Sequence, residues 1–199
     1  MTLRHRRAQC WAVQDEDFVL LDRWKDGNTD AGDELMRRHF DSLCNFFRSK
    51  VDSGVEDLVQ DVLLRCVERR EQFRGEASFR TYLFVIARRI LLDRLRKEYR
   101  RGTPLNFSEV SLVDLGTTPS QAVARDQGRA VLIAALRELP VDFQIAVELT
   151  YWENLSAPEV GRVLGINPNT VRSRLARARK ALDGTLRLLE ERTDKMTET

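Results

Sequence analysis

The arginines within residues 154–182 could bind the phosphates and bases of DNA, because the residues around them predict two short helices joined by a turn. Ser156 and Glu159 have the Ser-x-x-Glu spacing of a capping box, which starts a helix by binding its free amide donors. Gly165 then suits a tight turn, and Pro168 suits the first position of a second helix. A short helix, a turn and a basic second helix predict a helix-turn-helix that places its second helix in a DNA major groove.

The expected second helix has one apolar side at 4-3-4 spacing, which leaves its opposite side to polar and basic residues. No acidic residue occurs from Val160 to Leu182, so this side would attract phosphates. The alternative is an ordinary helical hairpin with a solvated basic face. The candidate DNA-binding residues are Arg172, Ser173, Arg174, Arg177 and Lys180.

A second polar group consists of Asp57, Gln60 and Asp61, whose spacing of three and four places them on one exposed face of a helix. This face could be simply solvated, could hold a nuclease-type metal pair, or could dock a basic partner. Two carboxylates without a third ligand nearby are too few for the metal site. A zinc site is not expected either, since the only histidines are His5 and His39.

A third group begins with residues 73–83, where aromatic, hydroxyl and arginine side chains alternate around a glycine. Residues 88–101 follow with seven basic and two acidic residues. Aromatic rings stack on unpaired bases while cations hold the phosphates, so this mixture suits single-stranded nucleic acid. The alternative is that the rings belong to the core, which we expect for Tyr82. The candidate residues are Phe73, Ser78, Arg80, Arg88, Arg89 and Arg96.

The totals limit the class of protein. The chain has 199 residues and a net charge of only +2, so nucleic-acid affinity must come from local basic patches. No apolar run has the length of a membrane span, and we expect no membrane insertion. Cys10, Cys44 and Cys66 lack paired short spacing and suit reduced thiols of a cytoplasmic protein. We find no phosphate loop or nucleophile elbow, and we expect no cofactor, no metal and no enzymatic activity.

Apolar periodicity of helical type recurs along the chain without sustained alternation of strand type, which predicts an all-α fold. A change of composition at 102–120, rich in glycine, proline and serine, predicts a flexible linker between two helical domains. Asp142 could cap the helix that follows Pro140. The expected divisions are a flexible extension 1–14, a first domain 15–101, the linker 102–120, a second domain 121–189 and a tail 190–199. The expected helices start near Asp15, Ala31, Val55, Ser78, Ser120 and Asp142.

Four segments in this order resemble bacterial sigma factors of the extracytoplasmic-function (group 4) type. Residues 56–62, Glu-Asp-Leu-Val-Gln-Asp-Val, resemble the family's polymerase-docking helix. Residues 73–83 with Ile86-Ala87-Arg88 resemble the stretch that captures the −10 element. Residues 136–140 and 170–179 resemble its −35-binding domain. The match covers about residues 17–101 and 121–187.

The resemblance implies an initiation subunit whose two domains are similar to regions 2 and 4 of sigma factors. The first domain would dock on the clamp helices of RNA polymerase core through Asp57, Gln60 and Asp61, and would melt the −10 region of promoter DNA. The second would read the −35 element with Arg172, Ser173 and Arg177, next to the polymerase flap. The linker would thread through the polymerase. The family's usual regulatory partner is an anti-sigma factor.

The sequence departs from the family pattern at three positions. Asn169 stands where Gly is usual, Gly161 replaces the usual Ala and would loosen its helix, and Arg89 stands where Asn is frequent.

Two alternatives from other functional classes stay open. One is a stand-alone helix-turn-helix regulator with an N-terminal helical sensor domain, which would need a ligand pocket in residues 17–101. The other is a DNA-cleaving enzyme that uses Asp57 and Asp61.

Overall fold

The computed structural model describes residues 16–73, 75–99, 105–116 and 127–197. Within these ranges the chain is helical and forms no β-strand, which confirms the all-α prediction. The helices are an N-terminal segment at 16–25, α2 (Thr29–Arg48), α3 (Val55–Glu68), the short 3₁₀ helix η1 (Arg70–Gln72), α4 (Phe79–Glu98), α5 (Gln127–Arg137), α6 (Val141–Tyr151), α7 (Ala157–Leu164) and α8 (Pro168–Thr197).

Two helices of the first helical block, residues 16–99, start with side-chain caps close to the expected positions. Asn28 caps α2 by accepting the Ala31 amide at 3.0 Å, and Ser78 caps α4 by accepting the Thr81 amide at 3.2 Å. The 4-3-4 spacing of Met36, Phe40, Leu43 and Phe47 predicts that all four face the core of the first block. Phe40 departs from this prediction, since it is 42% exposed and its neighbour His39 is buried instead. The helix can turn His39 inward because Asp17 lies 2.7 Å from its ring nitrogen and satisfies it.

The second helical block, residues 127–197, contains the predicted helix-turn-helix. The capping box forms, with the Ser156 amide donating to Glu159 at 2.8 Å. Gly165 ends α7 with φ 69°, a left-handed conformation that favours glycine. The second helix, α8, runs on to Thr197, so the expected tail is helical over 190–197.

Close packing requires a glycine at position 161. A Cβ atom there would lie 2.7 Å from the Ile166 carbonyl oxygen, which is closer than atoms can approach without a shift. The same turn is held by the Ile166 amide, which donates to the Gly161 carbonyl at 2.9 Å. Gly161 therefore lets the turn of the helix-turn-helix fold back against α7.

The described part of the linker, residues 105–116, is packed against the helical blocks. Phe107 and Leu112 are buried, and Ser111 forms a bridge with Pro140. The Val141 amide donates to the Val110 carbonyl at 3.0 Å. Turn-forming residues occur as readily in ordered loops as in mobile ones, and here two apolar side chains anchor the loop to the core. The remaining linker residues, 102–104 and 117–120, and the extension 1–14 lie outside the described residues.

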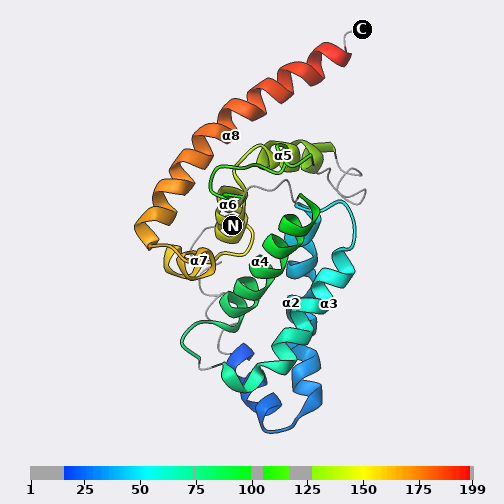
Figure 1. Cartoon of the computed structure of the whole chain (residues 1–199), viewed down its shortest axis with the longest axis vertical. Helices are drawn as coiled ribbons and strands as arrows, with labels where there is room; N and C mark the ends of the chain where they lie inside the picture. The colour runs from blue at the N-terminus through cyan, green and yellow to red at the C-terminus, as the bar shows by residue number, and fades with distance from the viewer. Residues whose placement is uncertain (1–15, 74, 100–104, 117–126, 198–199) are drawn as a thin grey trace.

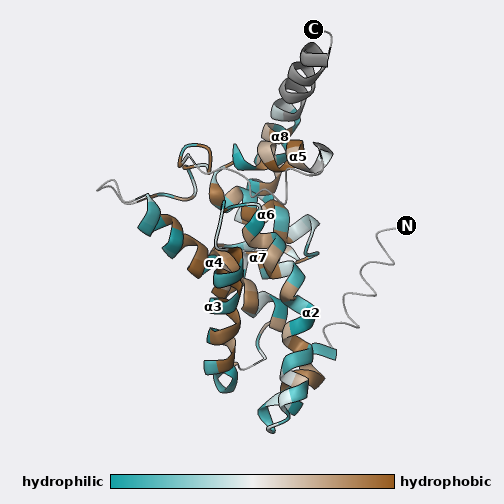
Figure 2. Ribbon diagram, turned by 90° about the vertical axis from the view of Figure 1, so that its right-hand side faces the viewer, coloured by the Kyte–Doolittle hydropathy of each residue, from teal (hydrophilic) through white to brown (hydrophobic). Residues whose placement is uncertain are grey.

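The two blocks lie directly against each other (Figure 1), with α4 packed against α3 on one side and against α7 on the other. Their buried apolar residues form one continuous core. Hydrophobic and hydrophilic residues both occur along α2, α3 and α4 (Figure 2), as expected for helices with one side in the core. Helix α6 is buried from Val141 to Leu149, including three polar residues, so it lies between other elements on all sides. None of the described helices has the length and apolar character needed to span a membrane.

Candidate nucleic-acid interface

The basic side of α8 is exposed and presents the residues predicted to bind duplex DNA. We call Arg172, Ser173, Arg177 and Lys180 the duplex face; all four are exposed. The opposite side of the helix carries Val171 and Ala178, which have no exposed surface. This division of α8 into a core side and a free basic side suits insertion into a major groove.

Local contacts give the duplex face its shape. The Arg172 guanidinium donates to the Asn169 side chain at 2.6 Å, and the Ser173 hydroxyl donates to the Thr170 carbonyl at 2.9 Å. The start of α8 is held by Asn167, whose side chain accepts the Asn169 amide at 2.8 Å. Thus Asn169, one of the departures from the family pattern, positions the arginine that we expect to read bases.

Arg174 differs from the other predicted duplex contacts because it points into the protein. Its side chain is buried and its guanidinium donates to Asp142 at 3.2 Å and to the Ser108 hydroxyl at 2.9 Å. It also lies over the Phe143 ring, 5.5 Å from its centre. In this conformation Arg174 fastens α8 to α6 and to the linker, and a role in binding DNA would require it to leave these partners.

The carboxylates of α3 form a second surface. We call Asp57, Gln60 and Asp61 the docking face; all three are exposed, while the buried side of α3 carries Val59 and Val62. A groove of about 360 Å³ runs beside them, with Arg94 and Lys97 of α4 on its other wall. Among the described residues no group of three or more potential metal ligands comes together.

Two exposed apolar residues extend the docking face. Leu64 and Val67 are 54% and 44% exposed, and they follow Asp57, Gln60 and Asp61 on the same side of α3. Sequence reasoning missed them because it considered only the polar residues of this helix as a docking surface. The signal was their spacing, since Leu64 lies seven residues after Asp57, where helical periodicity returns to the same side.

Phe73 is placed differently from its prediction. Its side chain is 6% exposed and lies in a cluster of rings, 5.1 Å from Tyr82 and 6.0 Å from Phe79 between ring centres. The Lys25 ammonium donates to its carbonyl at 2.8 Å and lies over its ring. Tyr82 is half-buried in the same cluster, as expected. A buried ring cannot stack on a base, so in this conformation Phe73 supports the fold of the first block.

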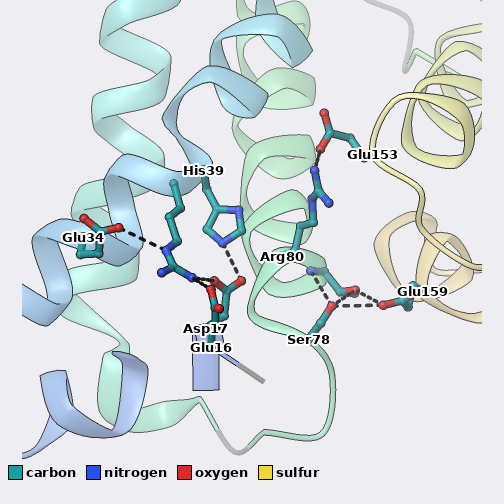
Figure 3. Close-up of polar contacts among 10 residues, drawn as sticks. Glu16, Asp17, Glu34, His39, Ser78, Arg80, Glu153 and Glu159 are labelled. Carbon is teal, nitrogen blue, oxygen red and sulfur yellow. Dashed lines mark hydrogen bonds and ion pairs between the residues drawn. The ribbon is translucent and has the colours of Figure 1, made fainter. Parts of the chain in front are cut away.

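The other predicted single-strand contacts are Ser78, Arg80, Arg88, Arg89 and Arg96, which we call the single-strand face. Three of them are held by carboxylates of the second block. Figure 3 shows the contacts of Ser78 and Arg80. The Ser78 hydroxyl donates to Glu159 at 3.1 Å, and the Arg80 guanidinium forms an ion pair with Glu153. Arg88 pairs with Asp142 at 2.8 Å.

The remaining two residues of the single-strand face are exposed. Arg89 points to solvent from the middle of α4. Arg96 forms an ion pair with Asp93 one turn away at 3.0 Å, and its guanidinium lies 5.3 Å from the centre of the Phe107 ring. The single-strand face is therefore divided: its end near the linker is open to solvent, and its end near the α4 N-terminus lies under the second block.

A buried polar network also joins the two blocks, and sequence reasoning did not find it. Lys50 has no exposed surface and forms an ion pair with Glu148 of α6, while Arg137 donates to the Ser49 carbonyl at 2.8 Å. The available signal was the presence of acidic residues in the otherwise apolar helix α6. Asp142, read as a helix cap, instead forms ion pairs with Arg88 and Arg174, and Pro140 takes the cap position.

The surroundings shift the pKa of two of these groups, Lys50 and Glu159. Burial lowers the pKa of the Lys50 ammonium, against the attraction of Glu148. Although burial opposes the change, hydrogen bonds from Ser156, Ser78 and Thr81 hold the pKa of Glu159 below its ordinary value. Glu159 is thus kept as a carboxylate at the contact between α4 and α7.

Comparison with known proteins identifies both blocks. Residues 35–101 match the family described as "Sigma-70 region 2", and residues 129–182 match "Sigma-70, region 4". The chain is 27% identical over 185 residues to the ECF RNA polymerase sigma-E factor of Escherichia coli (strain K12), covering 88% of this chain and 97% of that protein. It is also 27% identical over 188 residues to the RNA polymerase sigma-H factor of Pseudomonas aeruginosa PAO1, covering 89% and 97%.

Two solved structures have a similar fold. CnrH in complex with the cytosolic domain of CnrY aligns with a TM-score of 0.67 at 25% identity, over 87% of this chain and 98% of that one. The sigma factor RpoE, in complex with the anti-sigma factor NepR from Bartonella quintana, aligns with a TM-score of 0.61 at 23% identity, over 78% and 96%.

Proposed function

The chain belongs to the sigma-70 family, as a sigma factor of the extracytoplasmic-function type, and on this premise we propose how its surfaces direct RNA polymerase core to promoters. It acts as an alternative sigma factor that binds core, reads the −35 element as duplex and captures the −10 element as melted strand. It needs no reaction of its own, because the polymerase performs the chemistry. Its place of action is the cytoplasm, where polymerase and chromosome meet.

The observation that carries this proposal is the presence of both matched regions, in order, with an exposed recognition surface on each. The docking face is free on α3 of the first block, and the duplex face is free on α8 of the second. A stand-alone regulator would use the helix-turn-helix alone and would leave the match to region 2 without a purpose. The sigma factor uses both.

The docking face suits the clamp helices of core for a physical reason. Asp57 and Asp61 supply negative charge, and Leu64 and Val67 add an exposed apolar margin. Charged groups steer association, while burial of the apolar margin contributes affinity. The second domain contacts the flap. This contact holds the duplex face upstream of the first domain, at the distance that separates the −35 element from the −10 element.

Within the DNA, the roles follow from the kind of contact. Arg172 and Arg177 can each offer a guanidinium to guanine in the major groove, and a good bidentate contact contributes about 1–3 kcal/mol of discrimination. Arg89 and Arg96 bind the backbone of the melted strand. Core polymerase holds both domains near their targets, so neither needs high affinity alone.

We also propose that an anti-sigma factor controls this chain. The similar structures of CnrH and of the Bartonella RpoE were solved with the cytosolic domain of CnrY and with the anti-sigma factor NepR, respectively. Such a partner would act by covering the docking face or by holding the two blocks together.

The test is run-off transcription with purified core polymerase on a promoter library, with and without this chain. We expect a defined set of transcripts only when the chain is present, and a stable complex with core in gel filtration. Absence of both, over a range of salt concentrations, would contradict the proposal. Specific duplex binding without polymerase, at affinities sufficient for repression, would instead favour the stand-alone regulator. Metal-dependent nicking that Asp57→Ala abolishes would favour the enzyme.

A further inference from the structure

The Phe143 ring of α6 contacts two arginines of α8. The Arg174 guanidinium lies 5.5 Å from the centre of this ring, and the Arg177 guanidinium lies 5.1 Å from it. Both distances are short enough for attraction between a cation and an aromatic face. Phe143 keeps only 9% of its surface exposed, so its ring serves as a contact for these side chains more than for solvent.

The two arginines differ in their other partners. The Arg174 guanidinium also donates to Asp142 and to the Ser108 hydroxyl, and the side chain is buried. Arg177 is exposed, and among the described residues the Phe143 ring is the one partner of its guanidinium. The ring is therefore one of several supports for Arg174, but it is the main support for Arg177.

Contact with an aromatic face leaves Arg177 able to bind DNA. The ring occupies no hydrogen-bond acceptor, so the guanidinium N–H groups directed away from it stay available. These are the groups that bind O6 and N7 of guanine in the major groove. A side chain that is already held on a ring also loses less rotamer freedom when it binds a base.

The first turn of α6 gives the Phe143 ring a fixed place. The Val141 amide donates to the Val110 carbonyl at 3.0 Å, and the Asp142 amide donates to the Phe107 carbonyl at 2.9 Å. Both bonds join this turn to the packed loop 105–116. The support of Arg177 thus comes from an element outside the helix-turn-helix, and this element is itself anchored.

Arg172, the other arginine expected to read bases, has a separate support. Its guanidinium donates to the Asn169 side chain at 2.6 Å, within α8 itself. A change of the Phe143 ring should therefore alter the position of Arg177 and leave that of Arg172 as it is. This separation provides an internal control.

We propose that Phe143 is a positioning residue for recognition of the −35 element. Its ring holds the Arg177 guanidinium ready to bind a base edge, and so it sets the strength of the base preference at the position that Arg177 reads. The inference rests on the proposed function, because it needs the duplex face to bind promoter DNA.

The test measures base preference at each −35 position, by transcription with core polymerase and the full chain from a library randomised there. Arg177→Ala first identifies the position that Arg177 reads. Phe143→Leu should lower the preference at this same position about two- to fivefold, because the attraction between cation and ring is lost. The position that Arg172→Ala identifies should keep its preference.

Two further variants separate positioning from stability. Phe143→Tyr keeps the aromatic face and should retain the preference. 3,4,5-Trifluorophenylalanine at position 143 keeps nearly the same shape but has fewer electrons on its face, so it should lower the preference at the Arg177 position alone. Val163→Ala is the control for stability, since Val163 is buried in α7. It should lower the melting temperature and leave every base preference unchanged.

The outcomes separate this inference from the proposed function. In the Arg177→Ala background, Phe143→Leu should cause no further change at that position, since the ring acts through Arg177. An unchanged preference with both leucine and the fluorinated ring, or an equal loss at all positions, would overturn the positioning role and leave the sigma-factor assignment intact. If Arg177→Ala alters no position, the positioning role fails as well. Absence of promoter-specific transcripts with the unaltered chain would contradict the proposed function itself, and the inference with it.

Discussion

The duplex face on α8 and the single-strand face on α4 are both basic helix surfaces, but they differ in what stands in front of them. Arg172, Ser173, Arg177 and Lys180 are exposed to solvent. Ser78, Arg80 and Arg88 are held by carboxylates from another part of the chain. A basic helix surface is therefore not always free to bind DNA, because ion pairs across a domain contact can occupy its arginines.

The comparison also suggests an order of events. The duplex face is already exposed and can contact duplex DNA while the two blocks are packed together. The single-strand face must first exchange its carboxylate partners for DNA. A partner that binds the second block more tightly when its carboxylates are released would favour this exchange, and we expect polymerase to be that partner. We therefore expect docking on core to precede capture of the melted strand.

The largest expected effect concerns docking, on which both faces depend. Asp61→Lys places a positive charge on the docking face and should lower affinity for core about ten- to a hundredfold, through repulsion by a basic partner. Fluorescence anisotropy of labelled chain titrated with core would measure it. Asp33→Lys is the control, since Asp33 is exposed on a different helix, α2, and lies outside the docking face. Equal losses for the two variants would show that the docking face is wrongly placed.

The next effect separates the two neighbouring arginines of α8. Arg172→Ala should reduce discrimination at one −35 position by about 1–3 kcal/mol and leave thermal stability and core binding unchanged. Arg174→Ala should lower the melting temperature instead, because it removes contacts to Asp142 and Ser108. Transcription from a randomised −35 library and thermal unfolding would measure the two outcomes. Reversal of this pattern would mean that the side of α8 facing DNA has been misassigned.

A smaller effect tests the turn that supports the duplex face. Gly161→Ala brings a Cβ to 2.7 Å from the Ile166 carbonyl oxygen and should destabilise the second block by about 1–3 kcal/mol. Single-strand binding by the first block should not weaken. Gly184→Ala provides the contrast: nothing lies within 4 Å of its Cβ, and the change should be stabilising by up to about 1 kcal/mol. Denaturant unfolding would measure the change in the free energy of unfolding for both variants. If Gly161→Ala left this free energy unchanged, the close packing at position 161 would be contradicted.

The smallest effect concerns the cysteines of the first block. Cys44 and Cys66 are buried, and burial raises the pKa of the Cys66 thiol to about 12. In a Cys10→Ser chain, neither should react with Ellman's reagent at pH 7.5 until denaturant unfolds the block, because the thiolate is the reactive form. Reaction in the folded chain at the rate of a free thiol would show that the first block opens far more readily than its packing indicates.

The existence and type of the helices were predictable because their determinants are local. The capping box of Ser156 and Glu159 and the start of α3 at Val55 lie where the sequence placed them. The docking face was also predictable, since its residues share one side of one helix. Prediction failed in α2, where either of two adjacent residues, Phe40 or His39, could face the core. Phe40 was expected inside, but His39 is buried because Asp17, more than twenty residues earlier, satisfies its ring.

The sequence by itself determined an all-α fold, four motifs in a family-specific order, and the residue types of three recognition surfaces. These are properties of helical periodicity and of side-chain chemistry, which act over a few neighbouring positions. Only the tertiary structure decided that Phe73 and Arg174 point inward, that residues 105–116 are packed, and that Arg80 and Arg88 are paired with Glu153 and Asp142. The partners in these pairs are separated by 73 and 54 positions, and no local pattern records which charges meet when the chain folds back on itself.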